Sequence, residues 1–173
     1  RTEALIAGWG RDEALKRELA EYEAAFVGVW NAAKESDIDM KGTCAPHFQR
    51  TAAVLASKRG GNPRIKLSSK GCLAGTGVCF VSHKGDVLPC GYFPVAARNL
   101  YDTKFPDIWR DSALFGELRD ASLLKGKCGI CSYRDACGGC RARALAQTND
   151  YLREDACCAY VPPENEMKEA AGL

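Results

Sequence analysis

Apolar residues recur at steps of three and four along the first part of the chain, between residues 12 and 35. They are Leu15, Leu19, Tyr22, Phe26, Val29 or Trp30, and Ala33, with charged residues between them. This period is typical of an amphipathic helix, and Asp12 is a suitable residue to cap its start. Residues 38–44 then alternate apolar with polar positions, which predicts a short strand, and residues 52–58 predict a second helix.

The next segment, residues 60–63, reads Gly-Gly-Asn-Pro and is dense in residues that break regular structure. We therefore expect a boundary there. It divides the chain into residues 1–63, a domain at residues 64–162, and a tail at residues 163–173 that we expect to be frayed.

Two apolar runs after this boundary, residues 78–83 and 87–90, predict a β-hairpin in which Gly85 supplies the positive φ of the turn. Short helices are expected at residues 106–110, with Pro106 in the first turn, at 113–119, capped by Ser112, and at 141–147. Residues 128–140 are too rich in Cys and Gly to predict regular structure. The fold class expected from these elements is α+β.

Length and charge exclude several classes of protein. A chain of 173 residues is too short for a complete (β/α)₈ barrel, which needs about 250. A net charge of +2 gives no basis for a nucleic-acid partner. No run approaches the roughly 18 apolar residues of a membrane helix, and the first residues lack a signal-peptide pattern. We expect a cytoplasmic protein without a membrane partner and, because it begins with Arg1, a piece of a longer one.

The 10 cysteines, against 2 histidines, are the outlying feature of the composition. Without an export signal, such a density indicates metal ligands or catalytic thiols and not disulfides. Nine of the ten lie after residue 64. The exception, Cys44, is expected to be a buried free thiol that packs as a small apolar side chain.

Four cysteines form the pattern C-x2-C-x5-C-x2-C at Cys128, Cys131, Cys137 and Cys140. Such a set can hold structural zinc or an iron–sulfur cluster. Zinc ribbons usually separate their two cysteine pairs by a dozen or more residues, so the gap of five favours the cluster.

The cysteine pattern as a whole resembles the SPASM domain, the auxiliary-cluster domain of many radical SAM enzymes. The resemblance lies in Cys72, in GDVLPC ending at Cys90, in this central run and in a late cysteine. The family more often has three residues in the last gap, where this chain has two. The resemblance implies two auxiliary iron–sulfur clusters of the [4Fe–4S] type. Its first ligand set would be Cys72, Cys79, Cys90 and Cys140, and its second Cys128, Cys131, Cys137 and either Cys157 or Cys158.

The similarity extends from about Cys44 to Pro162, through CAPHF, PCGYFPV, FPDIWRDSALFGELRD and the central run. Over this length the chain resembles the radical SAM proteins that trim side chains of iron tetrapyrroles, a subgroup that includes the alternative-pathway haem b synthase. The resemblance implies that residues 1–63 are the last units of a (β/α) barrel. It also implies oxidative decarboxylation of iron-coproporphyrin III propionates, with an auxiliary cluster accepting an electron.

The C-x3-C-x2-C motif that holds the SAM-cleaving cluster of radical SAM enzymes does not occur in this chain. We therefore expect no activity from the chain alone. SAM, a third [4Fe–4S] cluster, the missing barrel half and an electron donor would belong to the intact enzyme. A peptide maturase and a non-catalytic zinc or electron-transfer module are the competing hypotheses.

His47 and Arg50 follow the predicted strand, where the catalytic face of a barrel would lie. Arg50 is a candidate to clamp a propionate and His47 to contact iron or propionate, although a capping His and a solvated Arg fit the same positions. His83 is expected to be structural. Arg141 and Arg143 have two interpretations, an electropositive helix start beside a cluster and a solvated helix face.

Overall fold

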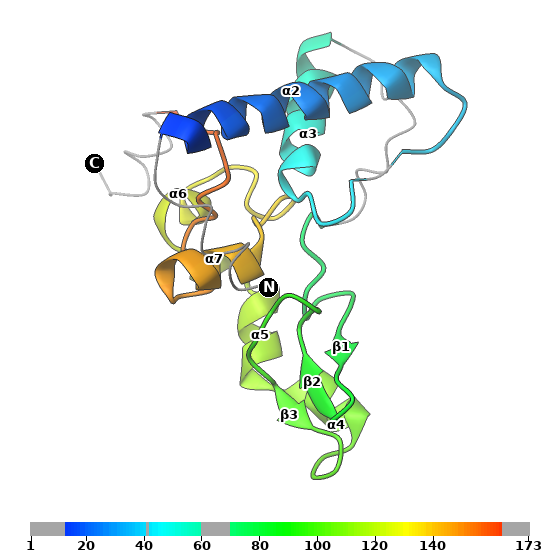
Figure 1. The fold of residues 1–173 in the computed structure, drawn as a ribbon, viewed down its shortest axis with the longest axis vertical. Helices are drawn as coiled ribbons and strands as arrows, with labels where there is room; N and C mark the ends of the chain where they lie inside the picture. Colours follow the sequence, from blue (N-terminus) through cyan, green and yellow to red (C-terminus); the bar gives the residue numbers. More distant parts are fainter. Residues whose placement is uncertain (1–12, 41, 60–69, 164–173) are drawn as a thin grey trace.

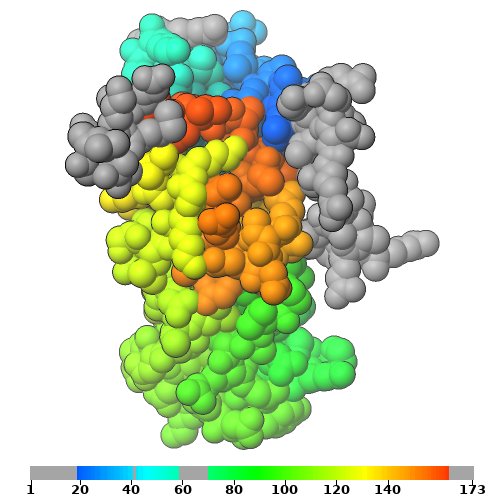
Figure 2. Space-filling model, turned by 90° about the vertical axis from the view of Figure 1, so that its left-hand side faces the viewer, coloured from blue at the N-terminus to red at the C-terminus, as the bar shows by residue number. Residues whose placement is uncertain are grey.

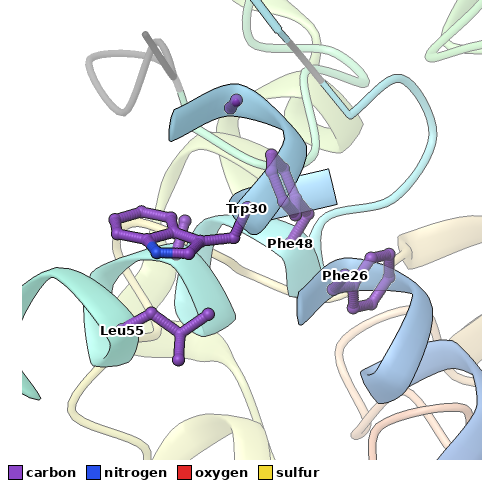
Figure 3. Close-up of a cluster of buried hydrophobic side chains, with 6 residues drawn as sticks. Phe26, Trp30, Phe48 and Leu55 are labelled. Atoms are coloured by element: carbon purple, nitrogen blue, oxygen red, sulfur yellow. The ribbon is translucent and has the colours of Figure 1, made fainter. Parts of the chain in front are cut away.

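The computed structural model describes residues 13–40, 42–59 and 70–163. Helix α2 (Glu13–Glu35) runs across one end of the molecule, and α3 (His47–Arg59) packs against it (Figure 1). We call α2 and α3 the helix pair. Buried Phe26, Trp30, Phe48 and Leu55 meet between the two helices (Figure 3). The spacing of four between Phe26 and Trp30 places both on one helix face, as the sequence predicts.

The strand predicted at residues 38–44 is wrong. Bends and turns occupy the described residues between the two helices, and Met40 makes only an isolated bridge. Ile38 is 70% exposed, so the alternating apolar residues do not form a buried face in this segment. Helix α3 begins five residues earlier than predicted, directly after Pro46, whose fixed φ suits a helix start.

The predicted hairpin is confirmed, and a third strand extends its sheet. Strands β1 (Phe80–Val81) and β2 (Asp86–Leu88) pair antiparallel, with Val81 opposite Val87. Gly85 makes the turn at a φ of 82°. Strand β3 (Arg98–Asn99), which the sequence pattern did not predict, pairs with the other edge of β2. At two or three residues each, these strands are too short to show alternation.

The remaining helices follow the predictions closely. They are α4 (Phe105–Asp111), α5 (Ala113–Arg119) and α7 (Arg141–Thr148). Ser112 occupies the N-cap position of α5, but its side chain makes no capping hydrogen bond. The single turns η1 (Ala121–Leu123) and α6 (Gly126–Gly129) were not predicted. Thus α6 is a short regular piece at the start of the otherwise irregular run of residues 128–140.

A second apolar core joins the sheet to α4, α5 and α7 through Val87, Phe93, Ile108, Phe115, Leu118 and Ala142. Between this core and the helix pair lies the segment of residues 126–158, which we call the cysteine segment. In Figure 2 it is the yellow-to-orange band between the blue and cyan helix pair and the green sheet region. The cysteine segment therefore lies between the two apolar units and contributes Ala142 of α7 to the second.

The architecture is α+β, with helices around one small antiparallel sheet. No strand accompanies α2 and α3 among the residues that the structure describes, so their origin in a barrel stays a prediction. The Asp12 cap, the boundary at residues 60–63 and all but the first residue of the 163–173 tail lie outside the described residues. No helix in the described ranges is long and apolar enough to span a membrane.

Candidate metal centre

Four of the predicted ligands lie around one small cavity. Cys128 in α6, Cys131, Cys137 and Cys158 all line it, together with His47, Arg50 and Tyr160. Cys157 does not line this cavity. It borders a different one, beside Phe26 and Cys44, since the chain turns at residues 155–158, where the N–H of Cys158 donates to the Asp155 carbonyl oxygen. The structure thus separates the two late cysteines, which the sequence could not rank.

Three predicted ligands of the other set line a second, larger cavity of about 620 Å³. They are Cys72, Cys90 and Cys140, each only partly buried. Cys79 is not among the residues that line this cavity, and it packs against the apolar core beside the sheet. Cys44 lines the cavity in its place.

The expectation for Cys44 is therefore wrong, because its side chain is exposed and not buried. The loop between α2 and α3 turns at this residue, with a left-handed φ of 55° that is uncommon for a side chain other than Gly, Asn or Asp. This turn brings Cys44 to the cavity wall and away from the apolar core of the helix pair.

Two consecutive glycines decide which cysteine faces which cavity. Gly138 and Gly139 both have positive φ, at 67° and 59°, in the short gap between Cys137 and Cys140. A Cβ on Gly139 would lie 2.5 Å from the Arg141 side chain and 2.9 Å from Asp155 Cβ. The turn places Cys137 at the small cavity and Cys140 at the large one, so the two cysteines of the last C-x2-C pair border different cavities.

Asp155, fully buried, holds the surroundings of both cavities together. Its carboxylate accepts hydrogen bonds from the backbone N–H of Cys140 at 2.7 Å and of Cys157 at 3.1 Å. The Arg143 guanidinium donates to both carboxylate oxygens, at 3.1 and 2.8 Å, and His47 Nε2 lies 3.0 Å from Oδ2. Burial opposes ionisation here, but His47 and Arg143 outweigh it and hold the pKa of Asp155 below its usual range.

Arg141 supports the same region from the start of α7. Its side chain is buried, and Nη1 donates to the carbonyl oxygens of Tyr151 and Arg153, both at 2.8 Å. Nη2 lies 3.9 Å from the Cys128 sulfur. The solvated-face interpretation of Arg141 is therefore wrong, and Arg143 is likewise largely buried, with 18% of its side chain exposed.

Burial raises the pKa of the Cys137 thiol to about 12 and that of Cys140 to about 11. It also raises the pKa of Cys90 and of Cys158. These thiols are therefore protonated at neutral pH unless a metal replaces the proton. Two guanidinium groups lie where they would offset the negative charge of a thiolate-bound metal centre. They are Arg50 beside Cys137 and Arg143 beside Cys140.

Among the described residues, no three His, Cys, Asp or Glu side chains converge closely enough to hold a single metal ion. In a [4Fe–4S] cluster each thiolate binds a different iron atom, so the sulfurs stand farther apart than the ligands of one zinc ion. The arrangement of four thiols around one cavity fits a cluster better than zinc.

The substrate candidates His47 and Arg50 are already engaged within the protein. His47 faces Asp155, while Arg50 pairs with Glu23 of α2 and lies over the Tyr160 ring at 5.0 Å. Both are buried and both border the small cavity. Their proposed contacts with a tetrapyrrole stay predictions. His83 lies outside both cavities, in the hairpin turn.

Asp155 is the residue that sequence reasoning missed. Its partners lie 12 positions upstream, at Arg143, and 108 upstream, at His47, and no local spacing rule joins such positions. The one local signal is its place two residues before Cys157, where an aspartate readily accepts the backbone N–H two positions on.

Residues 72–141 match the SPASM family, described as an iron–sulfur cluster-binding domain. The class of protein is therefore one that carries a SPASM domain. The chain is a relative of AdoMet-dependent heme synthases: it is 47% identical to that of Methanosarcina barkeri over 156 residues and 39% identical to that of Nitratidesulfovibrio vulgaris over 166. These alignments cover 87% and 91% of this chain and 45% of each relative.

Shorter stretches resemble a mycofactocin maturase and PqqA peptide cyclases. The chain is 40% identical to the mycofactocin maturase of Mycobacterium tuberculosis over 76 residues, which cover 41% of this chain and 19% of that protein. The chain thus spans less than half the length of the relatives it matches, and its similarity to the heme synthases extends over far more of it.

Proposed function

We propose that this chain is the auxiliary-cluster portion of a radical SAM enzyme that oxidatively decarboxylates propionates of iron-coproporphyrin III in haem biosynthesis. The observation that carries the proposal is the gathering of cysteines around two cavities, in a chain 47% identical to an AdoMet-dependent heme synthase. On this proposal α2 and α3 are the last units of the barrel, and an N-terminal half supplies SAM binding.

The proposed reaction removes a hydrogen atom from the propionate β-carbon, then CO₂ and one electron, and leaves a vinyl group. When bound, an auxiliary iron–sulfur cluster supplies a one-electron acceptor for that last electron. The residues of this chain would hold two such clusters and surround them with Arg50, Arg143 and Lys127, whose charges favour an anionic centre.

For the second cluster the geometry favours Cys128, Cys131, Cys137 and Cys158 as ligands, with Cys157 as the spectator. Replacing Cys158 with Ala should remove about half of the iron and sulfide, and Cys131→Ala should do the same. Cys157→Ala is the matched control and should keep the full content. Equal loss from both late-cysteine variants would contradict this assignment.

Metal analysis separates the proposal from the zinc module. Anaerobically reconstituted chain should contain about eight Fe and eight sulfide and show a visible absorption that dithionite bleaches. Zinc alone in a fully folded chain would refute it. Against a peptide maturase, iron-coproporphyrin III added to the intact enzyme should shift its Soret band, whereas a precursor peptide should not bind.

The role of the clusters in the reaction is tested in the intact enzyme. Cys90→Ala there should still cleave SAM to 5′-deoxyadenosine but form little haem, since only the exit of the electron is blocked. Full haem formation by this variant would give the cluster a structural role. The present chain alone should yield neither product, because it has no C-x3-C-x2-C motif.

A further inference from the structure

The large cavity is lined by four thiols, but they are not the four that the SPASM resemblance implies. Cys72, Cys90 and Cys140 come from the matched SPASM residues, whereas Cys44 comes from the loop that joins the helix pair. Four thiols from four separate segments thus face one space.

Cys79 faces the other way. Its neighbour Val78 forms a bridge with Ala74 and is one of the residues that line the large cavity. Consecutive side chains of an extended chain alternate in direction, so Cys79 points away from the cavity. It packs against the core of the sheet region, as Cys90 and Cys140 also do, but unlike them it is not among the residues that line the large cavity.

The loop around Cys44 is shaped to present this thiol. Gly42 lies so close to Phe48 that a Cβ there would be only 3.0 Å from the ring. Phe48 is buried in the core of the helix pair, so this contact fixes the loop. Thr43, Cys44 and Pro46 then border the cavity, and the left-handed φ of Cys44 is the kind of local strain that is retained at functional sites.

We propose that Cys44 supplies the fourth thiolate of the first cluster, together with Cys72, Cys90 and Cys140, and that Cys79 is a core residue. This inference rests on the proposed function, since it needs a cluster in the large cavity. Its consequence is structural as well as chemical: the cluster would tie the helix pair to the sheet region across the cavity.

Thiol footprinting tests the inference without a mutation. The chain is alkylated briefly with iodoacetamide, with and without reconstituted iron and sulfide, and the label on each cysteine is measured by peptide mass spectrometry. Exposed Cys44 should react readily without iron and be protected at least tenfold with it. Equal labelling in both states overturns the proposal, and so does a Cys44–Cys157 disulfide that blocks labelling in both.

A pair of variants gives the second readout. Cys44→Ala should lose about half of the iron and sulfide, with the loss of one of the two signals in the electron paramagnetic resonance spectrum of the reduced chain. Cys79→Ala is the matched control and should keep both signals. The opposite result, full iron in Cys44→Ala and loss in Cys79→Ala, restores the ligand set that the family resemblance implies.

The two proposals fail differently. If the unmodified chain takes up no iron and sulfide, the proposed function fails before Cys44 is tested. If it takes up both and Cys44→Ala retains them, only the present inference fails. Because Cys44 is exposed, its replacement should leave the far-ultraviolet circular dichroism of the helices unchanged.

Discussion

The helix pair and the cysteine segment are neighbours with opposite kinds of interior. Between α2 and α3 lies an apolar core with large side chains, among them Trp30 and Phe48. In the cysteine segment the buried side chains are small, polar or charged, with Arg141 and Asp155 among the most buried. Apolar burial therefore accounts for the first region, while the second depends on buried hydrogen bonds and on thiols that a metal can join.

Removal of iron should produce the largest difference in stability between the cysteine segment and the helix pair. Without metal the cysteine segment has little apolar area to hold its turns, and its thiols are neutral, so it should open. Hydrogen–deuterium exchange should show protection lost over residues 126–158 and kept in α2 and α3. Equal protection with and without iron would mean that the buried Asp155 network suffices.

Trp30→Ala should weaken the helix pair selectively. Trp30 is fully buried, so its loss should cost about 3–5 kcal/mol in unfolding free energy, measured by urea denaturation. Iron content should stay unchanged. Val29, the neighbouring residue at 38% exposure, is the matched control, and Val29→Ala should cost about 0.5 kcal/mol at most. Iron loss in Trp30→Ala would show that the two regions are one cooperative unit.

Asp155→Asn should weaken the cysteine segment instead. It removes the negative charge that faces Arg143 and His47, and breaking such a buried pair should cost about 3 kcal/mol. Urea should then release iron, followed by visible absorption, at a lower concentration. Asp135→Asn, whose side chain is 82% exposed, should leave that midpoint in place. Identical midpoints in the two variants would remove Asp155 from its supporting role.

The smallest effects have opposite signs at two glycines. Gly139→Ala forces a Cβ into a left-handed turn against Asp155 and should cost about 1–3 kcal/mol and lower the iron content. Gly116 lies within α5 with no atom within 4 Å of an added Cβ, so Gly116→Ala should gain about 0.5–1 kcal/mol. Thermal melts check both, and a stabilised Gly139→Ala would contradict the role of the turn.

Local patterns were informative where an element is regular. The period of α2, the turn at Gly85 and the helix at residues 141–148 could each be read from a few consecutive positions. The prediction of a strand at residues 38–44 was wrong, because an alternation of two apolar residues indicates a strand only where one face of the segment is buried. Ile38 is exposed.

The sequence by itself determined the class of site, because ten cysteines and their spacing already indicate iron–sulfur chemistry. Only the tertiary structure decided which thiols share a cavity. That choice rests on the direction of single side chains: Cys158 and not Cys157 at the small cavity, and Cys44 and not Cys79 at the large one. Such directions follow from the turn at Gly138 and Gly139 and from loops packed by distant residues, which spacing along the chain does not record.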